Sequence, residues 1–225
     1  MGKSSLKLER ILAKKLGVKF VILTTSGTSA LMMATLALDL KKQDKIISPN
    51  LTWVATINPA RIIGSKIHLV DSQYNSEKIN YELLNSSIKK IKPKIVYLVH
   101  LNGQPEYNSE FGKLKRRYKF KVIEDAAQSL FVKEKNKFSG TLSDIGCFSL
   151  SITKPLNMVY GGFCVTNDKF LANKLKAIRN NGVNANPEDA KLELASSKGL
   201  NLKPSDLHSV VGIENLKLKN QIFQK

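Results

Sequence analysis

Apolar and polar residues follow two alternating periods along the chain. Short apolar runs, rich in β-branched residues, are typical of buried strands, and segments with helical spacing separate them. In the first helical segment, Leu8, Leu12 and Leu16 share one face; Ser4 or Ser5 can cap it, and Gly17 ends it. Repeated alternation of strands with helices predicts an α/β fold with a mainly parallel sheet flanked by helices.

The expected elements follow one another without an internal repeat or an interdomain linker, so residues 1–225 are expected to form one domain. Strands are expected at residues 19–25, 45–48, 66–71, 94–100, 120–124, 144–149 and 161–166. Helices are expected at residues 4–16, 31–40, 52–63, 81–91, 108–118, 168–179 and 204–223. A small irregular hairpin is expected at residues 130–138, and a long polar loop at residues 180–202.

Composition narrows the class of protein. No apolar run is long enough to span a bilayer, and the N-terminus lacks the apolar core of a signal peptide. Cys147 and Cys164 lie in apolar runs, which favours buried reduced thiols over a disulfide. These features predict a cytoplasmic protein with no membrane partner.

The formal net charge of +18 raises the question of a nucleic-acid partner. The basic residues are scattered as pairs, such as Lys14-Lys15 and Lys89-Lys90, on expected helix ends and polar faces. That distribution favours a solvated surface over a binding stripe, and no nucleic-acid-binding module is recognisable. A positive field would still attract a small polyanionic substrate.

The segment SLSITKPLNMVYGG, residues 149–162, carries the strongest chemical hypothesis. Its Lys154 lies between two apolar strand-like runs. Poor solvation there would lower the pKa of the amine and favour its nucleophilic form, which can condense with a carbonyl compound. Most single lysines are solvated surface charges, so the hypothesis depends on the surrounding motifs.

Two further patterns point to a site at the ends of strands. Residues 26–30, SGTSA, join a strand to a helix, and free N–H groups at a helix N-terminus bind anions, although an ordinary capping turn has the same pattern. Asp125 follows the buried run of residues 120–124, where open α/β sheets place ligands. Glu124 is the alternative carboxylate, but alternation along a strand points the two side chains in opposite directions. Trp53 is either a core residue or a flat surface for a heteroaromatic ring.

Together the motifs resemble the pyridoxal-phosphate sugar aminotransferases of the DegT/DnrJ/StrS type, over nearly the whole chain. The motifs are SGTSAL (26–31), TWVAT (52–56), VHLNGQP (99–105), EDAAQS (124–129), SDIGCFSLSITK (143–154), GG (161–162), IRNNG (178–182) and GLNLKPSDLHSVVGIENL (199–216). The resemblance implies the aspartate-aminotransferase-like fold, fold type I, with this chain as its large domain. The family's smaller C-terminal domain and a short N-terminal segment are expected to be absent.

The resemblance implies a role for each matching residue. Lys154 matches the lysine that binds the cofactor covalently and moves a proton during the reaction. Asp125 matches the aspartate that pairs with the pyridine nitrogen and keeps the ring an electron sink. Trp53 matches the aromatic residue that stacks on the ring, and Gln128 the residue near the ring hydroxyl.

The remaining matches concern the cofactor phosphate. Thr28, the backbone of Gly27 and Ser29, and Ser149 match the phosphate cradle. Asn201 matches an asparagine that reaches the partner subunit's phosphate, which implies a homodimer with shared active sites.

The resemblance implies an aminotransferase that moves an amino group, from glutamate, onto a nucleotide-linked keto sugar in polysaccharide or amino-sugar biosynthesis. Lys154 stands where the family's dehydratases have histidine, which favours transamination. The chain departs from the usual family pattern at Asn102, Pro155 and Tyr160. The alternative is a truncated protein that keeps the fold and has little or no turnover.

Overall fold

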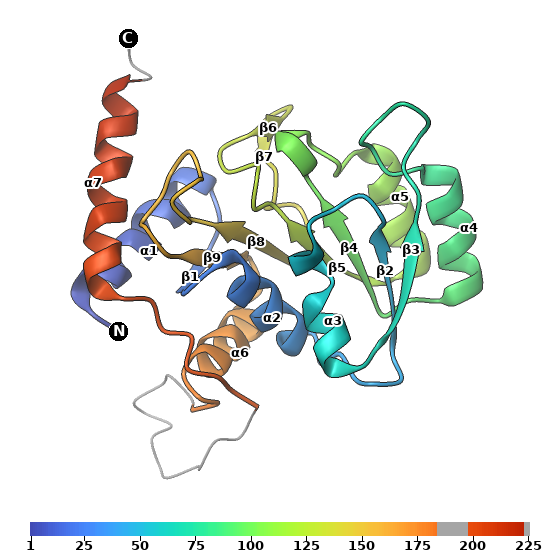
Figure 1. Cartoon of the computed structure of the whole chain (residues 1–225), viewed down its shortest axis with the longest axis horizontal. Coiled ribbons are helices and arrows are strands. Elements are labelled where there is room, and N and C mark those ends of the chain that lie inside the picture. Colours follow the sequence, from blue (N-terminus) through green and yellow to red (C-terminus); the bar gives the residue numbers. More distant parts are fainter. Residues whose placement is uncertain (184–197, 223–225) are drawn as a thin grey trace.

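The computed structural model describes residues 1–183 and 198–222 and contains a seven-stranded sheet in the order β1-β9-β8-β5-β4-β2-β3 (Figure 1). The strands are β1 (Phe20–Thr24), β2 (Lys45–Pro49), β3 (Lys66–Val70), β4 (Ile95–Val99), β5 (Lys121–Asp125), β8 (Ile145–Ser149) and β9 (Gly162–Thr166). Strands β3, β2, β4, β5 and β8 pair in parallel, whereas β9 is antiparallel to both β8 and β1. The predicted mainly parallel sheet is confirmed, with β9 as the reversed strand.

Helices cover both faces of this sheet. They are α1 (Lys3–Leu16), α2 (Gly27–Ala37), α3 (Asn58–Ile63), α4 (Tyr81–Ile91), α5 (Ser109–Tyr118), α6 (Lys169–Arg179) and α7 (Asp206–Ile222). One face packs against α2, α3 and α6; the other packs against α1 and α7 at one end and α4 and α5 at the other (Figure 1). A two-stranded hairpin of β6 (Lys133–Glu134) and β7 (Lys137–Phe138) lies within the predicted segment 130–138.

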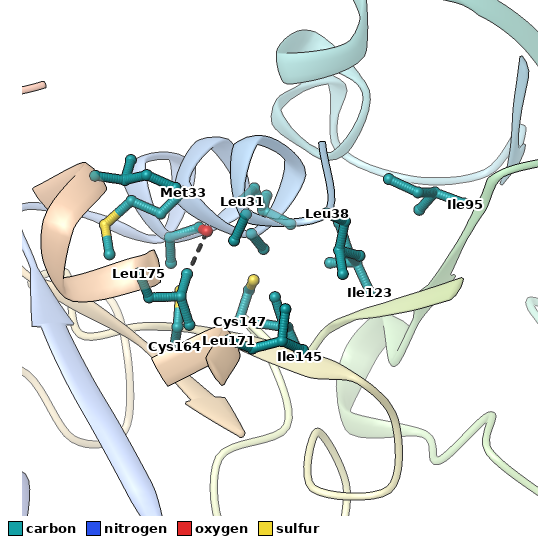
Figure 2. Packing of buried hydrophobic residues seen from close by; sticks show 14 of the residues in the cluster. Leu31, Met33, Leu38, Ile95, Ile123, Ile145, Cys147, Cys164, Leu171 and Leu175 are labelled. Carbon is teal, nitrogen blue, oxygen red and sulfur yellow. Dashed lines mark hydrogen bonds between the residues drawn. The ribbon is translucent and has the colours of Figure 1, made fainter. Parts of the chain in front are cut away.

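Alternate residues of each strand enter opposite cores. In β1, Ile22 packs on the α2 side, whereas Val21 and Leu23 pack on the α1 side. Cys147 of β8 lies opposite Cys164 of β9, and both are buried free thiols that face α2. Figure 2 shows this layer, in which the Cys164 Sγ donates a hydrogen bond to the Ala30 carbonyl at 3.3 Å. Burial on both faces explains the near-continuous apolar strands in the sequence.

Several element boundaries differ from the predicted ones for local reasons. The second helix begins at Gly27 rather than residue 31, because the Ser26 side chain caps it by accepting a hydrogen bond from the Ser29 N–H at 3.0 Å. The predicted helix over residues 52–63 is instead a 3₁₀ turn, η1 (Val54–Thr56), followed by α3.

The first helix is capped from a distance. Gly2, rather than Ser4 or Ser5, is its N-cap residue and supplies no side chain. The Asp206 carboxylate at the start of α7 accepts hydrogen bonds from the Ser5 N–H at 2.7 Å and the Ser5 hydroxyl at 2.8 Å. This contact fixes α7 against α1.

Two further observations complete the outline of the chain. Within residues 1–183 and 198–222, no helix has the length and apolarity needed to cross a membrane. Most of the predicted loop at residues 180–202 lies outside the described residues, and Asn180 and Asn201 at its ends form an isolated β-bridge.

Candidate active site

A cleft of about 450 Å³ opens where the parallel strands β4, β5 and β8 end. It is lined by residues from five segments: 26–31, 52–55, 99–101, 125–128 and 149–154. The sequence-predicted site residues Gly27, Thr28, Trp53, Asp125, Gln128, Ser149 and Lys154 all line it. Ser29 and Asn201 are not among the lining residues. The cleft therefore occupies the edge of the sheet at which α/β proteins bind ligands.

One end of the cleft is built for an anion. The Ser26 hydroxyl accepts a hydrogen bond from the Ser29 N–H, whereas the N–H groups of Gly27 and Thr28, in the first turn, have no acceptor inside α2. They open into the cleft beside Ser149, and the helix dipole adds positive potential. Ser29 holds the turn through its hydroxyl, which bonds those of Thr25 at 2.8 Å and Ser26 at 2.9 Å. Ser29 thus supports the turn, and its backbone contact with the phosphate stays a prediction.

Glycines keep this end of the cleft tightly packed. A Cβ at Gly27 would lie 2.9 Å from the Ser149 Cβ, so the helix start and the end of β8 approach closely only without a side chain. A Cβ at Gly162 would lie 2.4 Å from the Ser26 carbonyl carbon and oxygen. These two contacts bring three chain segments together around a space suited to a phosphate group.

Asp125, the last residue of β5, also lines the cleft. Its Oδ2 accepts a hydrogen bond from the Thr56 hydroxyl at 2.7 Å, and its Oδ1 accepts one from the Ala127 N–H at 3.2 Å. Burial raises the pKa of Asp125, and the two hydrogen bonds oppose that rise. A buried carboxylate of this kind is suited to pair with a ligand cation or a protonated ring nitrogen.

Lys154 and Trp53 line the same cleft as the α2 N-terminus and Asp125. Lys154 is half-buried in the turn between β8 and β9, where its backbone N–H donates to the Ser151 carbonyl at 2.9 Å. Trp53 is 73% exposed, so it is a cleft wall rather than a core residue. The cleft thus combines an amine, a carboxylate, an anion site and an exposed aromatic surface.

Gln128 is oriented by the loop that follows β4. Its Oε1 accepts a hydrogen bond from the Asn102 N–H at 2.7 Å, which directs the amide N–H groups elsewhere. Asn102 adopts a left-handed conformation, with φ of 49°, and its side chain donates to Glu77 at 2.7 Å. Asn102, which departs from the family pattern in sequence, therefore positions a residue of the cleft.

A buried network behind the cleft connects the ends of β4 and β5. His100 accepts a hydrogen bond at Nδ1 from the Glu106 N–H at 3.0 Å, so its Nε2–H donates to Glu124 at 2.8 Å. Glu124 also accepts from the N–H groups of Gly140 and Leu142, both at 2.9 Å. Burial acts to raise the pKa of Glu124, but these partners hold it below its usual value. Glu124 and Asp125 thus point to opposite sides of β5, as the alternation predicted.

Glu106 gives this network a measurable pH dependence. Burial raises its pKa to about 7 from an ordinary 4.5, so between these pH values the folded chain keeps a proton that the unfolded chain has lost. The free energy of unfolding should therefore fall as pH rises from 4.5 to 7. Glu106→Gln should remove this fall. Above pH 7 its free energy of unfolding should exceed that of the wild type by up to about 3 kcal/mol.

Urea unfolding at pH 4.5 and pH 8 checks this expectation. The exposed Glu110, in the helix that follows, provides the matched control Glu110→Gln, which should change neither value appreciably. An equal stability change for Glu106→Gln at both pH values would contradict the assigned titration.

Sequence reasoning missed Thr56 and His100. Both lie within motifs, TWVAT and VHLNGQP, that carried the resemblance, but their roles depend on contacts between separate segments. Asn201 is exposed and outside the cleft of its own chain, although the neighbouring Leu202 carbonyl accepts a hydrogen bond from Thr24 at 3.0 Å. Asn201 is therefore held near the anion end without entering it.

Known proteins share the family and the fold of this chain. The DegT/DnrJ/EryC1/StrS aminotransferase family matches residues 1–225. A UDP-4-amino-4,6-dideoxy-N-acetyl-beta-L-altrosamine transaminase of Campylobacter jejuni is 31% identical over 230 residues, which cover 100% of this chain and 59% of the relative. This chain thus spans less than two thirds of that relative's length.

Solved structures give the same result. A DegT DnrJ EryC1 StrS aminotransferase from Brucella abortus superposes with a TM-score of 0.89 at 27% identity, covering 97% of this chain and 59% of that one. An E. coli GDP-4-keto-6-deoxy-D-mannose-3-dehydratase with bound hydrated PLP superposes with a TM-score of 0.87 at 27% identity. The match covers 96% of this chain and 60% of that one. The fold is that of the pyridoxal-phosphate-dependent aminotransferases, as the sequence predicted.

The chain belongs to the DegT/DnrJ/EryC1/StrS aminotransferase family.

Proposed function

We propose that residues 1–225 form the cofactor-binding large domain of a pyridoxal-phosphate-dependent aminotransferase. In this proposal the amino acceptor is a nucleotide-linked keto sugar, and the amino donor is glutamate. The observation that carries the proposal is one cleft that holds Lys154, Asp125 and the free N-terminal N–H groups of α2. The altrosamine transaminase relative supports the substrate class.

The residues present fit pyridoxal phosphate at each part of the molecule. The α2 N-terminus, Thr28 and Ser149 would hold the phosphate, and Trp53 would cover one face of the ring. Asp125 would keep the ring nitrogen protonated, and Gln128, whose Oε1 is already bound by Asn102, would donate its amide N–H to the ring hydroxyl. When bound, this cofactor supplies a carbonyl for amine exchange and an electron sink for the carbon that loses a proton.

The chain's own groups then divide the work. Lys154 would provide the amine that binds the cofactor and would hold and move the proton exchanged during the reaction. Asp125 would accept a hydrogen bond from the protonated ring nitrogen, and burial would preserve this pairing because water competes poorly there. The excess of positive charge would attract the polyanionic nucleotide-linked sugar to the cleft.

The assembly and the location of the enzyme belong to the same proposal. Asn201 lies exposed near the anion end and is suited to reach a partner subunit's phosphate in a homodimer. The buried free thiols Cys147 and Cys164 are compatible with the reducing cytoplasm.

Titration of the purified chain with pyridoxal phosphate tests the proposal. Visible absorbance that becomes fixed to the protein on borohydride treatment is expected. Bound cofactor should then lose that absorbance on addition of glutamate and regain it on addition of a nucleotide keto sugar. Absence of any saturable absorbance change would overturn the proposal.

Asp125→Asn should separate cofactor capture from chemistry. Asparagine keeps the shape of the side chain and can still accept the Thr56 hydrogen bond, but it does not stabilise a protonated ring nitrogen. The variant should bind the cofactor and react with glutamate more slowly by orders of magnitude. Stopped-flow measurement of the glutamate half-reaction checks this, and a near-normal rate would remove Asp125 from the mechanism.

A further inference from the structure

A chain of two hydroxyl groups ends on the carboxylate of Asp125. The Thr52 and Thr56 Oγ1 atoms are 2.8 Å apart, and the Thr56 Oγ1 is 2.7 Å from the Asp125 Oδ2. Thr56 is fully buried, and Asp125 is 6% exposed. The contact with Asp125 joins segments 69 residues apart in the sequence, so tertiary structure creates it.

The geometry fixes the direction of the hydrogen bonds while Asp125 is ionised. A carboxylate only accepts, and therefore the Thr56 hydroxyl hydrogen must point to Asp125. A hydroxyl has one hydrogen, so the bond between the threonines uses the hydrogen of Thr52. Thr52 thus orients Thr56, and Thr56 donates to the carboxylate.

The local backbone holds both threonines on the same side of the segment. The 3₁₀ turn η1 closes with a hydrogen bond from the Thr56 N–H to the Trp53 carbonyl at 3.0 Å. This turn directs Trp53 out into the cleft while Thr56 faces inward to β5. The branched Cβ of threonine further limits its rotamers. One short segment therefore supplies both the aromatic wall and the donors to Asp125.

We propose that Thr56, oriented by Thr52, is a positioning residue that keeps the Asp125 carboxylate ionised and aimed at the ring nitrogen of the cofactor. The pairing with the cofactor rests on the proposed function, whereas the effect of Thr56 on the ionisation of Asp125 does not. Burial favours the neutral form of Asp125, and the Thr56 hydroxyl is the largest influence acting against it. Without that hydroxyl, Asp125 would carry less charge to pair with the ring.

The first test uses the chain without cofactor. The Asp125 carboxyl carbon is followed by NMR against pH, with its signal identified by its loss in Asp125→Asn. Thr56→Val, which has nearly the same shape without the hydroxyl, should raise the pKa of Asp125 by about one unit or more. Thr56→Ser should restore it, and Thr52→Val should raise it by less. The titratable neighbours His100, Lys154, Tyr97 and Cys147 are unchanged in all these variants.

The second test measures the dissociation constant of pyridoxal phosphate by absorbance. Thr56→Val should weaken binding about tenfold or more, whereas Thr56→Ser should stay close to wild type. In the Asp125→Asn background, Thr56→Val should have little further effect, because Thr56 acts through the carboxylate.

Thr166→Val is the matched control for loss of a buried hydroxyl. Thr166 is 3% exposed, and its hydroxyl donates to the Asp144 carbonyl at 2.8 Å. It is the last residue of β9, which runs antiparallel to β8 and therefore ends on the side of the sheet away from the cleft. It should lower stability and leave both the Asp125 pKa and cofactor binding unchanged.

The outcomes distinguish this inference from the proposed function. An unchanged pKa of Asp125 in Thr56→Val, or a shift equally large in Thr56→Ser, overturns the positioning role. If Thr56→Val does not fold, Thr52→Val and Thr56→Ser decide the question by the same titration. If wild-type protein fails to bind pyridoxal phosphate while the pKa shift is observed, the proposed function fails and the hydroxyl chain stands.

Discussion

Lys154→Ala should abolish covalent capture of pyridoxal phosphate by the chain. After addition of cofactor and borohydride, wild-type protein should carry the mass of the reduced cofactor on a single peptide containing Lys154. The variant should carry none, because among the described residues no other one that lines the cleft supplies a primary amine. The visible absorbance of bound cofactor should be lost together with the mass increase.

The position of Lys154 explains why this effect should be so large. Its turn begins directly after Ser149 at the anion end of the cleft, and its charge interacts with that of Asp125. Binding of the phosphate by α2 would hold the cofactor in the same cleft as this amine, so the two reactants would be kept together. Loss of the amine removes the nucleophile itself rather than one of several binding contacts.

Lys45→Ala serves as the matched control for the loss of a lysine. Lys45 is exposed at the beginning of β2, at the edge of the sheet away from the cleft. Peptide mapping by mass spectrometry should find the cofactor at Lys154 in that variant as in wild type. Equal labelling of wild type and Lys154→Ala would show that another amine reacts.

The sequence contained enough information for the fold because the strands are buried on both faces. Apolar runs such as residues 95–99 have no polar face, which is typical of a parallel sheet covered by helices. Capping residues placed some helices closely: Asn80 and Asp168 cap α4 and α6 with their side chains, and both helices lie close to the predicted ranges.

Boundaries failed where distant contacts replaced local ones. Nothing near Ser4 indicates that the carboxylate of Asp206 completes the start of α1, because that contact spans about two hundred residues. The turn around residues 52–56 has the composition of a helix start, but the bond from Thr56 to Asp125 holds it as a short 3₁₀ turn.

Some residues of the candidate site could be predicted from the order of strands, whereas others depend on distant contacts. Lys154, Asp125 and the α2 N-terminus follow strands, so topology alone brings them to one edge of the sheet. The supporting partners of that site depend on tertiary pairing, as in the bond between His100 and Glu124. Motif matching marked the segments that contain these partners without assigning their roles.

The paired glycines of residues 161–162 give the second large effect, because they differ in what surrounds them. Gly162 begins β9 and is paired with Thr24 on one side and Ser149 on the other. A methyl group there would lie 2.4 Å from the Ser26 carbonyl and 2.6 Å from the Gly27 nitrogen, which are backbone atoms of the anion site. Backbone cannot rotate out of the way as a side chain can, so the start of α2 must move.

Gly162→Ala should therefore weaken pyridoxal phosphate binding by about tenfold to a hundredfold. Overpacking costs about 1–3 kcal/mol, and here it would displace the backbone that forms the phosphate cradle. Gly161→Ala is the matched control, because its methyl group would meet the side chain of Met158, at 2.4 Å from Sδ, rather than backbone. It should lower thermal stability while cofactor affinity stays within a few fold of wild type. Absorbance titration and thermal unfolding of both variants separate the two effects. Equal affinity of the two variants for the cofactor would show that the contact between Gly162 and Ser26 does not shape the cradle.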